Sequence, residues 1–338
     1  MSPRLTTPTA LCALLLGLVG LTQIGILGQY EQTFLCTMGI YMILAASLNL
    51  VNGYMGEFSC GHAGFMAVGA YTASVVGVVL FVGDPHFGPA LLPMELAPLA
   101  FPLVLATGFV SAAVVGLLVA IPSFKTRGDY LAVITLAAGY IVKSALENIE
   151  VVGGPRGFMG MKKVTLSIEE TFAVPWMLIW IFIGVVLTVW LLRRFVYSTY
   201  GKGVMAIHQD EVAAEIMSVN TNHMKLVAFM LSSGLAGLAG GLYAYLIGFV
   251  NPASFTILRS TECLVMVYLG GMGSLTGSIL AAGIFTIMLE FLKPLEQLKW
   301  VAIPMLLIVL MQFRPEGLMG NRELSDIFPK LKRFYRFK

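Results

Sequence analysis

Ten apolar stretches, almost free of charged residues, follow one another along this chain and are separated by short charged segments. A helix needs about 20 apolar residues to cross the hydrocarbon core of a bilayer. Charged residues make up 12% of the 338 residues, whereas they make up about 25% of ordinary soluble domains. They are too few to cover a water-soluble globule. We therefore predict an all-α, polytopic membrane protein with about ten transmembrane or re-entrant helices.

The apolar stretches define the expected helices: 10–28, 34–52, 61–82, 98–121, 130–149, 173–192, 226–249, 259–273, 277–292 and 300–313. The last three are short for complete crossings, which is typical of re-entrant or pathway-lining segments in transporters. The first stretch follows Arg4 and could be a signal peptide, but residues 25–29 contain no small-x-small cleavage site. We expect it to remain as an uncleaved first helix.

The distribution of basic residues predicts the orientation. With ten crossings both termini lie on the same side, which receives fourteen Lys and Arg residues against six on the other side. Cytoplasmic loops carry the excess of positive charge. We therefore expect a single membrane domain over residues 1–338, with a cytoplasmic loop at 193–225, a cytoplasmic tail at 314–338, and segments 83–97 and 150–172 outside.

The loop at 193–225 is the longest polar interruption and contains a short amphipathic helix within residues 201–217. Its acidic and apolar positions are Asp210, Glu211, Val212, Glu215 and Ile216. Negative charge near the start of a helix suits the helix dipole, and an amphipathic helix has one apolar face to cover. Such a helix could fit a groove in a partner protein, or it could be a surface helix in a plain connecting loop. The sequence leaves both interpretations open.

Two Gly-rich segments, residues 47–71 and 268–277, interrupt the apolar stretches in the two halves of the chain. Polar groups at membrane depth are costly and usually face a cavity or a partner helix, and paired helix breaks point to a central path. The residues expected nearest that path are Asn49, Ser59, Gly61, His62, Gly270, Gly271 and Gly273. Each of these glycines could instead serve only close helix packing.

Common catalytic and nucleotide-binding motifs are missing from the sequence. It contains no G-x-x-x-x-G-K-[ST] phosphate loop, no H-E-x-x-H zinc motif and no G-x-S-x-G nucleophile elbow. Ser59 precedes His62 by three residues, but no third member of a triad can be named. Four cysteines (Cys12, Cys36, Cys60 and Cys263) lie in or beside apolar segments without metal-ligand spacing. We expect no enzyme activity, cofactor or metal in this chain.

Five segments, taken in order, resemble the LivM-type permease subunits of branched-chain amino-acid ABC importers. They are 48–71, 126–136, 153–157, 206–220 and 268–277. The loop of that family typically reads Ala-Ile-Arg-Glu-Asp-Glu, followed by Ala-Ala. This chain has Ala-Ile-His-Gln-Asp-Glu at 206–211, so the basic residue and the first acid are replaced. The resemblance covers nearly the whole chain.

The resemblance implies a membrane domain with inverted repeats in a bacterial inner membrane, importing branched-chain or other hydrophobic amino acids. Its partners would be a second homologous permease, a periplasmic solute-binding protein and two cytoplasmic ATPases that hold ATP and Mg²⁺. Residues 201–220 resemble the coupling helix that sits in the ATPase groove. Urea and short-amide importers use similar permeases, so the solute stays open.

An ion-coupled secondary transporter is the alternative from a different class. It would require carboxylates inside the membrane that carry protons or sodium. The candidates in this sequence are Glu147, Glu262 and Glu290. Each also lies close to an expected interface, where it could simply be solvated.

Overall fold

The computed structural model describes residues 3–25, 27–83, 86–124, 130–172, 174–295, 299–313, 316–320 and 323. Its α-helices are α1 (Pro3–Gln23), α2 (Gln29–Asn49), α3 (His62–Phe81), α4 (Ala97–Ser123), α5 (Tyr130–Asn148), α6 (Met161–Phe172), α7 (Trp176–Val196), α8 (Thr199–Gln209), α9 (Glu211–Ile216), α10 (Thr221–Ile247), α11 (Ile257–Gly270), α12 (Leu275–Leu292) and α13 (Lys299–Phe313). A single antiparallel pair joins β1 (Phe158–Met159) to β2 (Phe249–Val250) within these ranges.

Every one of the ten apolar stretches forms a helix, which confirms the prediction of an all-α, multi-pass membrane protein. In the described part of the chain, seven helical segments are long and apolar enough to cross a membrane. The helices α11 and α13 have 14 and 15 residues and are too short for that test, as expected. The third stretch expected to be short, 277–292, instead forms α12, whose 18 residues (Leu275–Leu292) are enough for a crossing because the helix begins two residues earlier than predicted. The inverted repeat and the single-domain assignment stay predictions.

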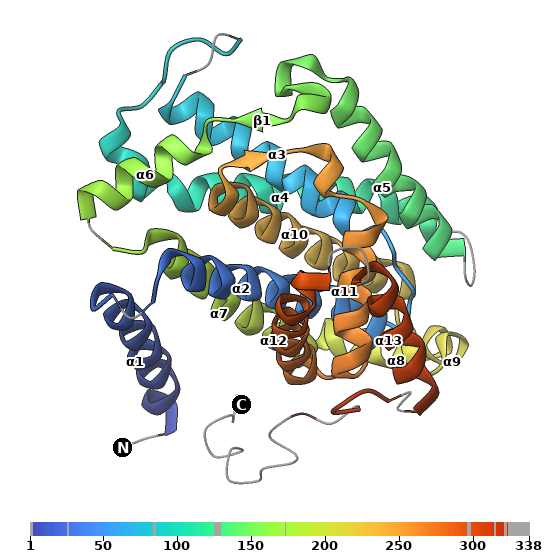
Figure 1. Cartoon of the computed structure of the whole chain (residues 1–338). Coiled ribbons are helices and arrows are strands. Elements are labelled where there is room, and N and C mark those ends of the chain that lie inside the picture. The colour runs from blue at the N-terminus through green and yellow to red at the C-terminus, as the bar shows by residue number, and fades with distance from the viewer. Residues whose placement is uncertain are drawn as a thin grey trace.

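The helix α10 lies at the centre of the molecule and packs against α2, α3 and α4 (Figure 1). Small residues allow this close approach. A side chain at Gly69 of α3 would collide with the backbone of Gly237 in α10, and one at Gly237 would collide with Ala112 in α4. The glycines of these helices therefore place three backbones in direct contact.

Contacts between helix ends agree with the alternating crossings expected from the sequence. The ring of Phe124, at the end of α4, lies 5.9 Å from the amino group of Lys225 near the start of α10. The amino group of Lys293, after α12, bonds the hydroxyl of Tyr30 in α2 at 3.2 Å. Each of these contacts joins two segments that the sequence places on the same side.

Two local expectations need correction. Residues 201–217 form two helices rather than one, because Asp210 adopts an extended conformation (φ −158°, ψ 108°) and its side chain caps α9. The outer segment 150–172 also contains a helix that was not predicted, α6, which buries Val164 and Ile168 and exposes Lys163.

Parts of two predicted segments lie outside the described residues. One is 125–129, which holds the basic residues of the loop between α4 and α5 and part of the segment 126–136. The other is the tail 314–338, of which only 316–320 and Glu323 are described.

Candidate functional site

The first Gly-rich segment breaks the helix between α2 and α3. The chain leaves α2 through a single π-helical turn, η1 (Leu50–Tyr54), in which the Met55 N–H donates to the Leu50 carbonyl at 3.1 Å. Residues 55–61 are not helical. Gly56 lies in the left-handed region with φ +75°, which a residue without a side chain adopts most readily. Isolated π turns of this kind are frequent at functional sites.

The second Gly-rich segment breaks the helix between α11 and α12. Gly271 and Gly273 have φ values of +108° and +83°, so both adopt conformations that favour glycine. The hydroxyl of Ser274 then accepts a hydrogen bond from the Gly277 N–H at 3.0 Å and caps α12. The structure therefore contains both helix breaks that the sequence indicated.

The two breaks lie side by side and are joined by Asn49. Its amide nitrogen donates to the Ser274 carbonyl at 2.9 Å, and its amide oxygen accepts from the Gly273 N–H at 3.1 Å. A side chain at Gly53 would collide with the backbone nitrogen of Gly273. The fold thus brings together Asn49, Gly270, Gly271 and Gly273 from the predicted set.

His62 belongs to a buried hydrogen-bond cluster at the start of α3. Its Nε2 lies 2.8 Å from the hydroxyl of Ser47, whose backbone carbonyl accepts from Ser232 of α10 at 2.6 Å. The partner of His62 is therefore Ser47 rather than Ser59. This arrangement fits helix packing and gives no support to a hydrolase site.

Asn52 and Ser59 form a polar pair inside the first break. The amide oxygen of Asn52 accepts from the Ser59 N–H at 3.3 Å. The Asn52 nitrogen and the Ser59 hydroxyl are buried and have no hydrogen-bond partner among the described residues. Buried polar groups without partners are rare and costly. We infer that these atoms gain partners from water, from solute or from a second conformation of the break.

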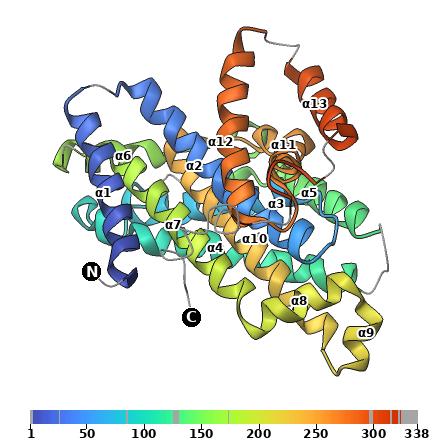
Figure 2. The same cartoon turned by 90° about the horizontal axis from the view of Figure 1, so that it is seen from below.

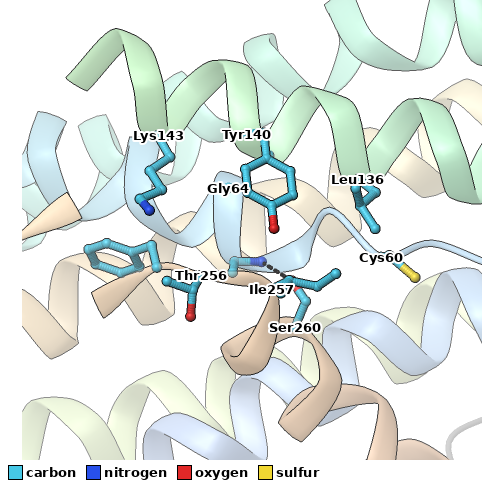
Figure 3. Close-up of a pocket in the computed structure, with 11 residues that line it drawn as sticks. Cys60, Gly64, Leu136, Tyr140, Lys143, Thr256, Ile257 and Ser260 are labelled. Atoms are coloured by element: carbon cyan, nitrogen blue, oxygen red, sulfur yellow. Dashed lines mark hydrogen bonds between the residues drawn. The ribbon is translucent and has the colours of Figure 1, made fainter. Parts of the chain in front are cut away.

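A pocket lies beside the first break, between α3, α5 and the start of α11 (Figure 3). Its cavity volume is about 20 Å³, which is room for about one water molecule, and it opens to the surroundings. Tyr140 and Lys143 extend from α5 toward Thr256 and Ser260, and the Ser260 hydroxyl accepts from the Ala63 N–H at 3.0 Å. The lining is mostly apolar with a few polar groups, as in many small-molecule sites.

None of the seven residues expected nearest the path lines this pocket. Gly61 and His62 stand between Cys60 and Ala63, which do line it. Asn49, Ser59 and His62 are at most 2% exposed. In this conformation the predicted residues therefore form the packed region next to the pocket, and their role as pathway residues stays a prediction.

The predicted coupling residues lie on α9 and at its start. Val212 and Ile216 are 66% and 78% exposed, so both apolar side chains point away from the rest of the chain. Asp210 accepts a hydrogen bond from the Ala213 N–H at 3.0 Å, and Glu215 accepts one from the Thr221 hydroxyl at 3.1 Å. Figure 2 shows α8 and α9 at one edge of the molecule.

Sequence reasoning missed an ion cluster behind α9. The amino group of Lys225 lies 2.8 Å from Glu57 and 2.8 Å from Glu211. In the sequence, Lys225 contributes one positive charge to the loop at 193–225, and its partner Glu57 lies in the first break, 168 positions away. The only sequence signal for this cluster is a charged residue, Lys225, directly before the apolar stretch 226–249.

The three carboxylates that could have carried ions are paired with basic side chains. Glu262 binds Arg259 at 3.0 Å, and Tyr41 donates to the same carboxylate. The other two pairs are Glu147 with Lys143 at 3.6 Å and Glu290 with Lys293 at 3.1 Å. Across the described residues, no group of three or more His, Cys, Asp or Glu side chains could hold a metal ion.

Comparisons with known proteins agree with this architecture. A family model described as the permease component of branched-chain amino acid transport systems matches residues 32–312. The high-affinity branched-chain amino acid transport system permease protein LivM of Salmonella typhimurium is 34% identical over 304 residues, which cover 83% of this chain and 68% of LivM. LivM of Escherichia coli K12 is 32% identical over the same shares.

More distant relatives extend the comparison. The permease protein LivH of Escherichia coli K12 is 22% identical, over 85% of this chain and 93% of LivH. No solved structure was found to match the chain. The family match begins within α2, so α1 lies outside the part that the family shares.

Proposed function

This chain belongs to the family of permease components of branched-chain amino acid transport systems, and from that premise we propose that it is the membrane subunit of an ATP-driven amino-acid importer. The observation that carries the proposal is the family match over residues 32–312. Seven helical segments that could cross a membrane support it. Because a permease is not a catalyst, ATP and Mg²⁺ would bind to separate subunits.

The exposed helix α9 supports docking of a cytoplasmic ATPase. Val212 and Ile216 point away from the chain at the end of the molecule that also holds Lys225. Exposed apolar side chains in a polar loop mark interaction sites. In the proposed complex, one ATPase would bind α9 of this chain and a second ATPase the equivalent helix of a homologous permease.

The pocket beside the first break supports a solute path. Phe255, Thr256 and Ile257 follow the loop after α10, which the orientation places outside, so we propose that solute released by a periplasmic binding protein enters here. The packed breaks around Asn49 would close the path toward the cytoplasm. The pocket would have to widen to admit an amino acid, and Lys143, which pairs with Glu147 at 3.6 Å in this structure, would then turn to the carboxylate of the solute.

The proposed substrate is a branched-chain or other hydrophobic amino acid, and the proposed location is a bacterial inner membrane with both termini in the cytoplasm. These assignments follow the function named for the relatives and the positive-inside distribution of charge. Urea and short amides are the alternative solutes, because they lack both the carboxylate and the large apolar side chain.

The test is purification of the tagged chain from native membranes, followed by identification of bound proteins and reconstitution with them. We expect two ATPases, a second permease and a periplasmic binding protein, and ATP-dependent uptake of leucine that isoleucine inhibits and urea does not. Uptake that urea inhibits instead would assign the alternative solute. Transport by the isolated chain without nucleotide or partners would overturn the importer assignment.

A further inference from the structure

A buried lysine joins the proposed docking helix to the first helix break. The side chain of Lys225 is 8% exposed, and its amino group contacts carboxylate oxygens of Glu57 and Glu211, each at 2.8 Å. Glu57 lies in the non-helical segment 55–61, Glu211 in the first turn of α9, and Lys225 near the start of α10. One cation therefore holds three elements together.

A second contact joins the same two regions. The imidazole of His208, near the end of α8, lies against Gly56, where a side chain would collide with the ring. Gly56 has φ +75°, so glycine also suits the backbone here. Two consecutive residues of segment 55–61 thus contact this region: Gly56 lies against α8, and Glu57 binds Lys225 of α10, which also binds Glu211 of α9.

The other end of segment 55–61 borders the pocket. The Cys60 N–H donates to the Thr135 hydroxyl of α5 at 3.1 Å, and Cys60 lines the pocket itself. Two residues lie between Glu57 and Cys60, which are at most about 10 Å apart along extended chain. A displacement of Glu57 would therefore move Cys60, which lines the pocket, through the short stretch of backbone that joins them.

The segment is not fixed by helical hydrogen bonds of its own. The Asn52 nitrogen and the Ser59 hydroxyl, on either side of Glu57, are buried without partners among the described residues. A π-helical turn, of the kind often found at functional sites, precedes the segment. Energetic coupling between sites requires an element with two arrangements that both sites can bias.

We propose that Lys225 is a positioning residue for transport, which links displacement of α9 by a docked ATPase to movement of segment 55–61 beside the pocket. This inference rests on the proposed function, because it requires an ATPase on α9. Lys225 contacts no solute in this assignment and acts through Glu57. A merely structural bridge would stabilise the chain without affecting how much solute moves for each ATP hydrolysed.

The test uses the complete complex reconstituted in liposomes, with Lys225→Met and Glu57→Met as the variants. Both remove the Lys225–Glu57 contact and leave Val212 and Ile216 in place for docking. Glu57→Met leaves Lys225 paired with Glu211, so no unpaired buried charge threatens folding. If Lys225→Met does not accumulate, the Lys225→Met, Glu57→Met double variant removes both charges. Lys293→Met is the control. The side chain of Lys293 is 60% exposed, follows α12 and pairs with Glu290 rather than with Glu57 or Glu211.

We expect normal amounts of co-purifying ATPase and a partial loss of solute moved per ATP hydrolysed, because ATP hydrolysis would no longer move segment 55–61 in every cycle. The control should keep the wild-type ratio. An unchanged ratio in the folded variants would overturn the link and leave the proposed function intact. Loss of ATPase binding in both variants would also overturn it, because Lys225 would then act in docking alone. A wild-type chain that binds no ATPase would overturn the proposed function, and this inference with it.

Discussion

Asn49 donates a hydrogen bond from its side-chain nitrogen to the backbone oxygen of Ser274, 2.9 Å away and 225 positions along the chain. The oxygen of the same amide accepts from Gly273 at 3.1 Å. One fully buried side chain therefore bonds two backbone groups of the second helix break, of which the Ser274 carbonyl also accepts from the Ser278 N–H at 3.1 Å. Asn49 holds the two breaks in register.

Replacement of Asn49 by leucine should destabilise the protein, because it leaves the Gly273 N–H without its partner while keeping a branched side chain at this position. The Ser274 carbonyl keeps its bond from the Ser278 N–H, so the expected cost is that of one unpaired group, about 1–3 kcal/mol. We expect a lower thermal midpoint in detergent and loss of uptake. Asn148→Leu is the matched control, since that exposed amide bonds only the Ser144 carbonyl of its own helix. Equal melting of the Asn49 variant and the wild type would contradict the register role.

Gly61→Leu and Gly271→Leu should each block transport. A side chain at Gly61 would collide with the Thr135 carbonyl oxygen, and Gly271 combines a φ of +108° with close contact to Gly320. Overpacking of this kind costs about 1–3 kcal/mol. Gly17→Leu is the control, because no atom lies within 4 Å of that position. Normal uptake by both variants at wild-type expression would remove these glycines from the mechanism.

The helices were predictable because each depends on a local property, a long apolar stretch. Among the described residues, six of the seven candidate spans and the short α11 and α13 follow from counting apolar residues, whereas α12 is longer than its apolar stretch indicated. The amphipathic α6 was missed because its 12 residues carry charge and contribute little hydropathy. The break at Asp210 was missed because it depends on the conformation of one residue. Asp210 is extended and its side chain caps α9, whereas a helical Asp210 would have continued α8.

The contacts of the candidate site were not predictable, because they join residues far apart in the chain. Nothing near Lys225 in the sequence indicates Glu57, and nothing near Asn49 indicates Ser274. The sequence did identify the Gly-rich segments in which these contacts form. It could not show that Asn49 and His62 are buried and hydrogen-bonded within the protein. The pocket is lined instead by Cys60 and Ala63, which lie on either side of Gly61 and His62 in the chain.

Single cysteines should report the proposed orientation in intact cells. Lys163 on α6 and Lys202 on α8 are both exposed, and the two helices are expected on opposite sides. In a background without the four native cysteines, an impermeant maleimide should label Lys163→Cys and spare Lys202→Cys. Both should react after the membrane is permeabilised. Labelling of Lys202→Cys but not of Lys163→Cys in intact cells would contradict the proposed orientation.

The thiol of Cys60 should react slowly with maleimide at neutral pH. Burial raises the pKa of this thiol, because the thiolate is poorly solvated beside the pocket. The thiolate is the reactive form, so the rate should rise with pH into a more alkaline range than for an exposed cysteine. Mass spectrometry of the adduct measures the rate, with Lys202→Cys as the exposed reference. Equal pH profiles for the two thiols would contradict the buried placement.

Val212→Asp combined with Ile216→Asp should abolish ATPase docking. Both side chains are mostly exposed on α9 and make few contacts within the chain, so the variant should fold and insert normally. Loss of central apolar anchors commonly weakens an interface by about 2 kcal/mol or more, and a charged replacement adds a desolvation cost. We expect loss of co-purifying ATPase and of solute-stimulated ATP hydrolysis. Val212→Leu with Ile216→Leu is the control, since it keeps the apolar face and should retain both. Coupled uptake by the aspartate variant would leave α8 and α9 as a plain connection between α7 and α10.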